Sequence, residues 1–416
     1  MRAALALFAG LLVALMAAQG CLVTLPEVHD ECATGTTACA GRCVRVAEDA
    51  HNCGVCGHDC GAQTCSRGSC EIATVPSPFA LATHPSDEFI YGTQGQASAD
   101  GTHLFKFPKD CGSAKPCTVT RMPPDRLGDQ TAWLRQRALV VDETAVYWIN
   151  IGRQIESDPI NADPPTGTVW RMPKSDPTKV CASPDRQGRP FGIALAPDGY
   201  LYWSNLIGGA GTGGQLMRVK KDALCTDKPQ AVDAATSHNV GPIAIVPKPI
   251  TPPSTSSYYL LWGTRDTRGT ERGVFRIEPN SPAPPSTVRE NAILTAAAPS
   301  DVVTDLKIFG DAIFFRYGRL DAEAGQASVR RAQLDVQRVS SVLYEASDPR
   351  QVAVDATHLY WTDGGKPARI VRAPIAGGAV ETVAITDSAQ ALLLDGPYLY
   401  FGEYRNGVVR RVRVKL

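Results

Sequence analysis

A short hydrophobic segment that ends in an aromatic pair, or a close equivalent, recurs seven times along the chain and constrains its fold more than any other feature. The copies are FIYGTQ (89–94), VYWINI (146–151), LYWSNL (201–206), LLWGTR (260–265), IFFRYG (313–318), LYWTDG (359–364) and LYFGEY (399–404). The residues taken as equivalent are Tyr91, Trp148, Trp203, Trp262, Phe315, Trp361 and Phe401. They lie between 40 and 59 residues apart, which is typical of β-propeller blades with loop insertions. The sequence therefore predicts an all-β protein built around a β-propeller.

Each copy contains four short runs with the length and composition of β-strands. In the sixth copy they are QVAVDA (351–356), HLYWTD (358–363), ARIVRAP (368–374) and ETVAIT (381–386). The first run of most copies is aliphatic, as suits the crowded strand nearest the axis. The third run carries a cation in register at Lys106, Arg171, Arg218, Arg276, Arg330 or Arg331, Arg372, and Arg410 or Arg411. We expect each cation to pair with an acidic or carbonyl partner on a neighbouring blade, the alternative being a functional ring of cations.

The two ends of the repeat predict how the ring closes. The seventh copy stops after VVRRVRVKL (408–416) without a fourth run, and EIATVPS (71–77) resembles the fourth run of the sixth copy. We expect residues 71–77 to supply the missing outer strand, because a closed ring leaves no long open edge.

The segment LYWTDGG (359–365) resembles the signature of the YWTD propellers of lipoprotein-receptor ectodomains, and VYWIN and LYWSN are looser copies. The resemblance covers about residues 71–416 and implies architecture rather than function, because propellers host unrelated activities. Known YWTD propellers have six blades, whereas seven copies are present here. We therefore predict seven blades, with six as the alternative.

The N-terminal end has the composition of a secretory signal over residues 1–20, with Arg2 followed by a short apolar stretch. Ala18, Gln19 and Gly20 precede Cys21 and resemble a bacterial lipobox, although the usual Leu three residues before the Cys is absent. The resemblance implies a diacylated Cys21 on a linker of residues 21–31, and Leu22 in place of an Asp implies the outer membrane, facing periplasm or exterior. The alternative is ordinary cleavage with a free thiol. Of 13 Cys, 12 remain without Cys21, an even number consistent with full pairing in an oxidising compartment.

Eight cysteines crowd residues 32–70 and predict a small module held together by disulfides rather than by an apolar core. They are Cys32, Cys39, Cys43, Cys53, Cys56, Cys60, Cys65 and Cys70. The segments NCGVCGHDC (52–60) and TCSRGSC (64–70) resemble the cysteine-rich module of the stigma-specific protein family. A zinc site formed by Cys53, Cys56, His58 and Cys60 is the alternative.

Four further cysteines fall in the predicted propeller, residues 71–416. Cys111 and Cys117 bracket a hairpin of the first blade, short enough to be closed by a disulfide. Cys181 and Cys225 remain to pair with each other, which would join the second blade to the third if their Cα atoms lie within about 7 Å.

The sequence favours binding over catalysis. Lys plus Arg and Asp plus Glu both number 42, so no charge excess indicates a nucleic-acid partner. Motifs of hydrolases, metalloproteases and phosphate-binding loops are absent from the sequence. Asp142, Asp198, Asp355 and Asp395 are expected to shape tight turns.

We therefore expect a non-catalytic binding or scaffolding lipoprotein without a cofactor, attached to the membrane by its lipid anchor. The alternative is a metal-dependent lactonase- or lyase-like enzyme with calcium or zinc at the axis, which would need polar side chains on the innermost strands. Only His84 and Lys307 clearly break the aliphatic character of those strands.

The connections between second and third strands are long, at residues 152–166, 207–214, 264–272 and 316–327, whereas those between first and second strands are tight. All second-to-third connections emerge on one face, and such loops usually carry recognition. We expect a protein or carbohydrate ligand on this face, with Arg268, Arg316 and Tyr317 as the first residues to test; the alternative is a solvated rim whose charges pair with one another. The full set is Arg153, Arg265, Arg268, Arg272, Arg316, Tyr317, Arg319, Tyr404 and Arg405.

Overall fold

The structure is a computed structural model that describes residues 32–95, 104–111, 117–122, 136–152, 166–206, 214–232, 240–247, 257–264, 273–279, 292–295, 302–318, 327–334, 340–365 and 367–414. The chain divides into two compact units, residues 1–45 and residues 46–416. The signal segment, Cys21 and the linker to residue 31 lie outside the described residues. In the part of the chain that the structure describes, no helix is long and apolar enough to span a membrane.

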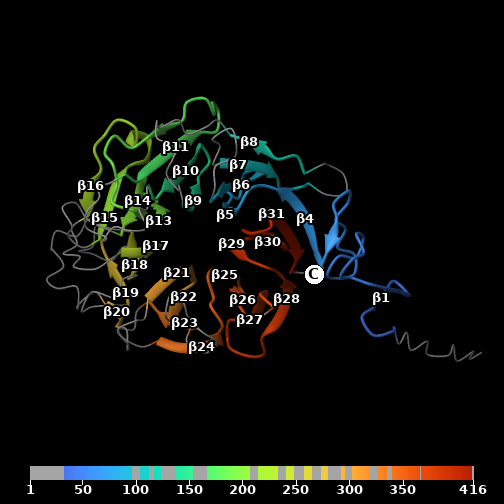
Figure 1. Ribbon diagram of the computed structural model, residues 1–416. Coiled ribbons are helices and arrows are strands. Elements are labelled where there is room, and N and C mark those ends of the chain that lie inside the picture. The colour runs from blue at the N-terminus through green and yellow to red at the C-terminus, as the bar shows by residue number, and fades with distance from the viewer. Residues whose placement is uncertain are drawn as a thin grey trace, which may run out of the picture. The chain divides into compact units, whose positions relative to one another are not determined.

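The second unit contains seven antiparallel sheets arranged around a ring (Figure 1), so the prediction of a seven-bladed propeller is confirmed and the six-bladed alternative is wrong. Blade 1 contains β5 (Pro78–Ala82), β6 (Phe89–Gln94), β7 (Leu104–Pro108) and β8 (Thr120–Arg121). Blade 2 contains β9 (Gln136–Val141), β10 (Ala145–Asn150), β11 (Thr168–Pro173) and β12 (Cys181–Ala182). Blade 3 contains β13 (Pro190–Leu195), β14 (Tyr200–Asn205), β15 (Gln215–Lys220) and β16 (Gln230–Val232), with a 3-10 turn, η2 (Lys221–Ala223), after β15.

Blade 4 contains β17 (Val240–Pro247), β18 (Tyr258–Thr264), β19 (Gly273–Ile277) and β20 (Ala292–Thr295). Blade 5 contains β21 (Val302–Phe309), β22 (Ala312–Gly318), β23 (Ala327–Gln333) and β24 (Ser340–Ala346). Blade 6 contains β25 (Val352–Val354), β26 (His358–Asp363), β27 (Arg369–Pro374) and β28 (Glu381–Ile385). In blades 1 to 6 the strands pair in chain order, and the innermost strands contact each other in succession around the axis.

Blade 7 closes the ring with a strand from the other end of the chain. It contains β29 (Ala389–Asp395), β30 (Tyr398–Glu403), β31 (Val408–Arg413), β4 (Ser69–Thr74) and β3 (Cys65–Ser66). Strand β4 pairs antiparallel with β31, from Val408 opposite Thr74 to Arg411 opposite Cys70. The innermost strand β29 in turn contacts β5 of blade 1. The closure predicted from the unfinished seventh copy is confirmed.

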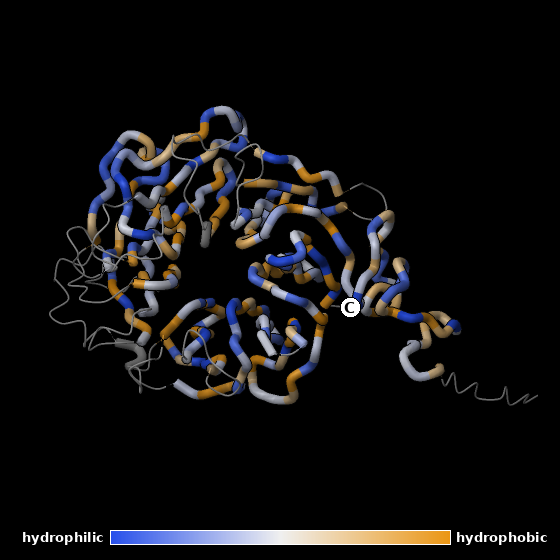
Figure 2. The backbone as a smooth tube through the Cα atoms, viewed as in Figure 1, coloured by the Kyte–Doolittle hydropathy of each residue, from blue (hydrophilic) through white to orange (hydrophobic). Residues whose placement is uncertain are grey.

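Each blade is buried on both faces, and this explains why the repeat contains two adjacent aromatic residues. Successive side chains of a strand point to opposite faces of the sheet, so Tyr147 and Trp148 face different neighbours. Trp148 packs with residues of blade 1, whereas Tyr147 packs with residues of blade 3, and both rings are buried. Figure 2 shows hydrophobic residues distributed along strands all round the ring. The core is therefore a series of layers between blades.

The register of the strands corrects one equivalence in the repeat. Gly92, not Tyr91, occupies the position of Trp148: Gly92 pairs with Leu81 and Phe105, as Trp148 pairs with Leu139 and Trp170. A Cβ atom on Gly92 would lie 2.3 Å from the Phe105 ring. The aromatic group of blade 1 thus comes from the third strand, and the second strand accommodates it with a glycine.

The cations of the third strands mostly connect one blade to the next. Arg218 donates to the carbonyl of Pro279 at 3.5 Å, Arg372 to that of Val414 at 3.0 Å and Arg411 to that of Cys111 at 2.8 Å. Arg276 donates to the carbonyl of Leu334, and Arg171 lies 3.6 Å from Asp222. For these five arginines the predicted partner on a neighbouring blade is confirmed. Lys106 instead lies 4.2 Å from the centre of the Phe89 ring in its own blade.

The cysteine-rich segment is divided between the two units. The first unit contains the hairpin of β1 (Thr37–Cys39) and β2 (Arg42–Val44) and the Cys32–Cys43 disulfide. In the second unit Cys53 is bonded to Cys65 and Cys60 to Cys70. Cys39 of the first unit and Cys56 of the second unit are also disulfide-bonded. Cys60 and Cys70 belong to the same apolar cluster as Phe107 and Tyr400 of the propeller. The propeller unit therefore begins at Val46 and includes a segment that the sequence assigns to a separate module.

The disulfides also concern the zinc alternative and the two cysteine pairs expected in the propeller. Cys53 and Cys60, two of the cysteines of the zinc alternative, are in disulfides, and a metal needs free thiolates. The propeller contains the two expected pairs, Cys111–Cys117 and Cys181–Cys225, with Cα atoms 4.8 and 5.8 Å apart.

Candidate functional site

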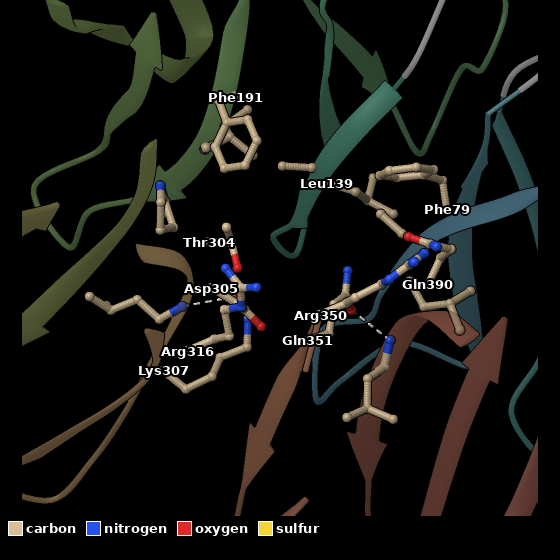
Figure 3. Close-up of a pocket in the computed structure, with 18 of the residues that line it drawn as sticks. Phe79, Leu139, Phe191, Thr304, Asp305, Lys307, Arg316, Arg350, Gln351 and Gln390 are labelled. Atoms are coloured by element: carbon tan, nitrogen blue, oxygen red, sulfur yellow. Dashed lines mark hydrogen bonds and ion pairs between the residues drawn. The ribbon is translucent and has the colours of Figure 1, made fainter. Parts of the chain in front are cut away.

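A cavity of about 680 Å³ lies at the axis of the propeller, lined by residues from all seven blades (Figure 3). Its volume is within the range of about 300–1,000 Å³ that is common for small-molecule sites. Several lining residues stand near the start of an innermost strand, among them Phe79 of β5, Phe191 of β13 and Gln390 of β29.

Strand pairing determines the end of the ring toward which the cavity lies. The start of each innermost strand lies beside the end of the second strand, as in the pairs Pro78 with Gln94, Pro190 with Asn205 and Ala389 with Glu403. The second-to-third connections leave from the ends of those second strands. The cavity therefore lies toward the face that bears these connections.

One side of the cavity is apolar. The side chains that form it come from blades 1 to 4 and are Phe79, Leu81, Leu139, Phe191, Ile193 and Ile243. Phe79 and Phe191 are partly exposed, and Figure 3 shows them with Leu139 on one side of the cavity. Phe79 also contacts Tyr404 edge to face, with ring centres 6.1 Å apart. This side can bind an aliphatic or aromatic group.

The opposite side is polar and comes from blades 5 to 7. Lys307 donates to Asp305 Oδ1 at 3.1 Å, and Asp305 Oδ2 accepts a hydrogen bond of 2.7 Å from the backbone N–H of Val352 in blade 6. Gln351 Oε1 accepts the backbone N–H of Leu392 in blade 7 at 2.8 Å. The polar side chains thus also join the innermost strands of adjacent blades.

Two arginines share one carboxylate in this polar wall. Arg350 donates through Nε to Asp348 Oδ2 at 3.0 Å, and Arg316 Nη2 lies 3.9 Å from Asp348 Oδ1. Arg316 is only 1% exposed and donates through Nε to the carbonyl of Pro349 at 2.9 Å. The Arg350 side chain is 49% exposed. Arg316 therefore supports the segment before β25 from beneath, and Arg350 presents its guanidinium to the cavity.

The same segment is tied to the end of β26. Thr362 Oγ1 accepts the backbone N–H of Arg350 at 3.0 Å, and the carbonyl of Ser347 accepts that of Gly364 at 2.6 Å. Asp348 has a φ of 51°, in the left-handed region that residues other than glycine seldom adopt. Such strained positions occur often at functional sites, where the surrounding structure holds them.

The residues expected on the ligand face are distributed differently from the prediction. Arg316 and Tyr317 lie on β22 and are 1% and 4% exposed, so their assignment to an exposed loop is wrong. Arg316 nevertheless lines the cavity, whereas the Tyr317 ring lies 4.3 Å from the guanidinium of Arg330. Tyr404 lines the cavity, and Arg405 is exposed. Arg153, Arg265, Arg268, Arg272 and Arg319 lie outside the described residues.

Of the two polar residues noted for the innermost strands, Lys307 lines the cavity and His84 does not. His84 Nδ1 lies 2.8 Å from Ser86 Oγ after the end of β5. The sequence interpretation overlooked Arg350, Gln351 and Gln390. Their signal is present in PRQVAVD and SAQALLLD, where polar residues stand at the start of an aliphatic run. Arg350 and Gln390 occupy the positions that Phe79 and Phe191 occupy in other blades.

Two of the recurrent acids, Asp142 and Asp355, have the structural role that the sequence predicts. Asp142 accepts the backbone N–H groups of Thr144 and Ala145, each at 2.8 Å, and Asp355 accepts those of Thr357 and His358. Burial alone would raise the pKa of Asp142, but hydrogen bonds from Lys221, Thr144 and Ala145 outweigh it and lower the pKa to about 2. Asp142 follows the end of β9, away from the start of the innermost strands.

The cavity lining offers few ligands for a metal. The described lining residues contain two carboxylates, Asp305 and Asp348, and no histidine. Elsewhere among the described residues, one group of potential ligands comes within metal-binding distance, Cys53, Cys60 and Cys70, whose sulfurs are in disulfides.

Residues 24–73 match the stigma-specific STIG1-like protein family. No curated protein matches the chain in sequence. Among solved structures, virginiamycin B lyase from Staphylococcus aureus is similar with a TM-score of 0.54 and 13% identity, over 82% of this chain and 97% of that one. The Dos1 propeller is similar with a TM-score of 0.55 and 9% identity, over 82% of this chain and 93% of that one.

The WD40 propeller domain of Doa1 is similar with a TM-score of 0.51 and 12% identity, over 83% of this chain and 96% of that one. Identities this low show the fold alone. The comparisons therefore describe a β-propeller that is preceded by a cysteine-rich segment similar to the stigma-specific family.

Proposed function

We propose that this protein is a non-catalytic binding protein of the cell envelope that holds a ligand in the axial cavity of its propeller. The observation that carries the proposal is the divided lining of the cavity, apolar on blades 1 to 4 and polar on blades 5 to 7. A concave site with an apolar wall and a few converging polar groups is the usual form of a small-molecule site. Its position toward the face of the long connections supports the expectation that recognition occurs there.

The arrangement of charges favours binding over catalysis. The acids of the cavity are paired with cations, Asp305 with Lys307 and Asp348 with Arg350. A nucleophile with a neighbouring base would favour a reaction. The described lining residues instead offer hydrogen-bond donors and apolar surface.

Ligand binding in the cavity can be tested with a substitution that fills the cavity with a large side chain. Gln390→Trp places a large ring among the lining residues, and it should abolish the binding of small aromatic fragments detected by saturation-transfer NMR. Gln230→Trp on the outer strand β16, where the side chain is exposed, is the matched control and should bind as the parent does. Fragments that bind equally to both variants would place the binding site elsewhere.

Attachment to the envelope would follow from acylation of Cys21, because two acyl chains suffice for stable membrane attachment. Cys21→Ser should move the protein from the membrane fraction to the soluble fraction without changing its circular dichroism. A parent protein that is entirely soluble, with an unmodified Cys21 at its N-terminus, would refute the anchor.

A metal-dependent lactonase- or lyase-like enzyme is the alternative, favoured by the similarity in fold to a lyase. Elemental analysis of the purified protein separates the two functions. Stoichiometric calcium or zinc that Gln390→Trp removes would support the enzyme and contradict the binding protein proposed here.

A further inference from the structure

We propose that the ligand of the axial cavity carries a single carboxylate, bound by Arg350, and beside it an aromatic or aliphatic group that packs against Phe79, Leu139 and Phe191. The proposal rests on the proposed function, in which the axial cavity is the binding site, and it adds the chemical class of the ligand. A free carboxylic acid and the carboxyl end of a peptide share this chemistry.

The net charge of the cavity lining favours a ligand with one negative charge. The described lining residues include three cations, Lys307, Arg316 and Arg350, and two carboxylates, Asp305 and Asp348. The cavity therefore has one positive charge more than it has negative charges. A monoanion would balance it, whereas a doubly charged phosphate would reverse the sign inside a partly enclosed site.

Arg350 has the geometry to receive a carboxylate. Its Nε donates to Asp348 Oδ2 at 3.0 Å and its Nη2 lies 3.0 Å from the same oxygen, and a guanidinium has five hydrogens to donate. Its side chain is half exposed, so the remaining donors can reach the cavity. Beside it, the Gln351 amide oxygen is occupied by the N–H of Leu392, which leaves the amide nitrogen as the group that faces a ligand. Two adjacent donors of this kind suit the planar, two-oxygen geometry of a carboxylate.

Arg316 acts on this site indirectly, as a positioning residue. It is buried, and its Nε and Nη1 donate to the carbonyls of Pro349 and Gly318 at 2.9 and 3.3 Å. Arg316 directly follows the repeat aromatic residue of blade 5. In blades 2, 4 and 7 this position holds Ile149, Gly263 and Gly402, so none of these three blades has a long cationic side chain there. Arg316 fixes the segment from which Arg350 projects.

The apolar wall determines the other end of the ligand. Phe79 lies edge to face with Tyr404, which holds its ring on the side of the cavity away from Asp305 and Lys307 (Figure 3). Phe191 and Leu139 continue this wall into blades 3 and 2. A ligand with its carboxylate at blade 6 would therefore place its apolar part against blades 1 to 3.

The test compares two probes that differ only in charge, N-acetylphenylalanine and N-acetylphenylalaninamide. In calorimetric titrations the acid should bind the parent protein about tenfold more tightly than the amide, because the charge-assisted hydrogen bonds form with the acid alone. Arg350→Met should abolish this preference while the amide binds as before. Arg369→Met is the matched control, because Arg369 also pairs with an aspartate, Asp363 at 3.0 Å, and is 46% exposed but does not line the cavity. It should retain the preference.

Two further arms separate the possible failures. Equal binding of acid and amide that Gln390→Trp abolishes would overturn the carboxylate proposal and leave the proposed function standing. Binding that survives Gln390→Trp, or no binding of either probe together with no fragment bound in the cavity, would overturn both. A preference retained in Arg350→Met would also overturn the proposal. A glycine-rich tetrapeptide ending in phenylalanine, free or amidated, distinguishes the sources: tighter binding than the single amino acid indicates a peptide end, and weaker binding indicates a free acid.

Discussion

Blades 6 and 7 have the same arrangement of three inner strands, but their outer strands come from different parts of the chain. Blade 6 is continuous from Val352 to Ile385, and a short turn joins its third strand to its outer strand. Blade 7 takes β29 to β31 from the C-terminal end and its outer strand β4 from residues 69–74. The same position in the sheet is thus filled in one blade by the next segment and in the other by a segment more than 300 residues away.

The contacts of the two outer strands differ accordingly. In blade 6, Arg372 on β27 lies 2.9 Å from Glu381 on β28, and the Glu381 side chain is 61% exposed. In blade 7, Arg410 on β31 lies 2.8 Å from Glu71 on β4 and 2.9 Å from Glu403 on β30, and the Glu403 side chain is 1% exposed. In blade 7 the pair of Arg410 with Glu71 joins the distant strand β4 to β31, and the buried pair with Glu403 holds Arg410 in place, where blade 6 has a short turn. Non-local closure costs more chain entropy, so it needs stronger contacts.

The largest effect expected from this difference is the loss of Arg410. Arg410→Met leaves the Glu403 carboxylate buried without its cation, and such a loss costs about 3–5 kcal/mol. Arg372→Met in blade 6, which removes a largely exposed pair and one hydrogen bond to a carbonyl, should cost about 1 kcal/mol. Urea unfolding of both variants measures the difference. Equal losses would mean that the two blades are closed with equal strength.

The disulfide between Cys60 and Cys70 is expected to have the next largest effect, because Cys70 lies on β4 itself. Replacing both residues with Ala should lower the free energy of unfolding by about 2–4 kcal/mol. Hydrogen exchange should localise the loss: amides of β4 and β31 should exchange faster in the variant, and amides of β27 and β28 should not. Uniform acceleration in all blades would show that the bond supports the whole ring rather than its closure.

The sequence predicts the ring well because the pattern that defines it is local. Strand length, aromatic pairs and turn residues recur within each copy, and the unfinished seventh copy requires a partner that EIATVPS supplies. The equivalence of Tyr91 is wrong because the second strand of blade 1 has a glycine, not an aromatic residue, at the equivalent position. Phe105 reaches Gly92 from the neighbouring strand, and only the register between two strands shows this.

The candidate site was less predictable because it depends on where a strand begins. Arg350 precedes the aliphatic run of residues 351–356 and Gln351 is its first residue, so the composition of the run assigns neither side chain to a site. Arg316 follows an aromatic pair and resembles a loop residue, but β22 continues to Gly318 and buries it. Convergence of side chains at the axis depends on the ring as a whole, which no single copy contains.

The pH dependence of stability gives a smaller and more specific test of the closure in blade 7. Burial would raise the pKa of Glu403, but the hydrogen bond and charge of Arg410 outweigh it and hold the pKa below the usual 4.5. A carboxyl whose pKa is lower in the folded state stabilises the protein above pH 4.5, and this contribution is lost as the pH falls through the folded-state pKa. Glu403→Gln should therefore show a shallower loss of unfolding free energy below pH 4.5 than the parent. Glu381→Gln in blade 6 is the control and should change the curve less than Glu403→Gln, because the Glu381 side chain is 61% exposed and water screens its charge.

The smallest effect is expected at the tip of the β3–β4 hairpin. Arg67 donates to Asp387 at 2.9 Å, and the two side chains are 48% and 46% exposed. Exposed ion pairs contribute about 0.2–1 kcal/mol, because water screens the charges and both side chains lose rotational freedom. Arg67→Met should accordingly lower the free energy of unfolding by no more than this, and about 1 M NaCl should remove the difference from the parent. A loss larger than about 1 kcal/mol that persists in salt would show that the hairpin tip, and not only β4, fastens the outer strand of blade 7.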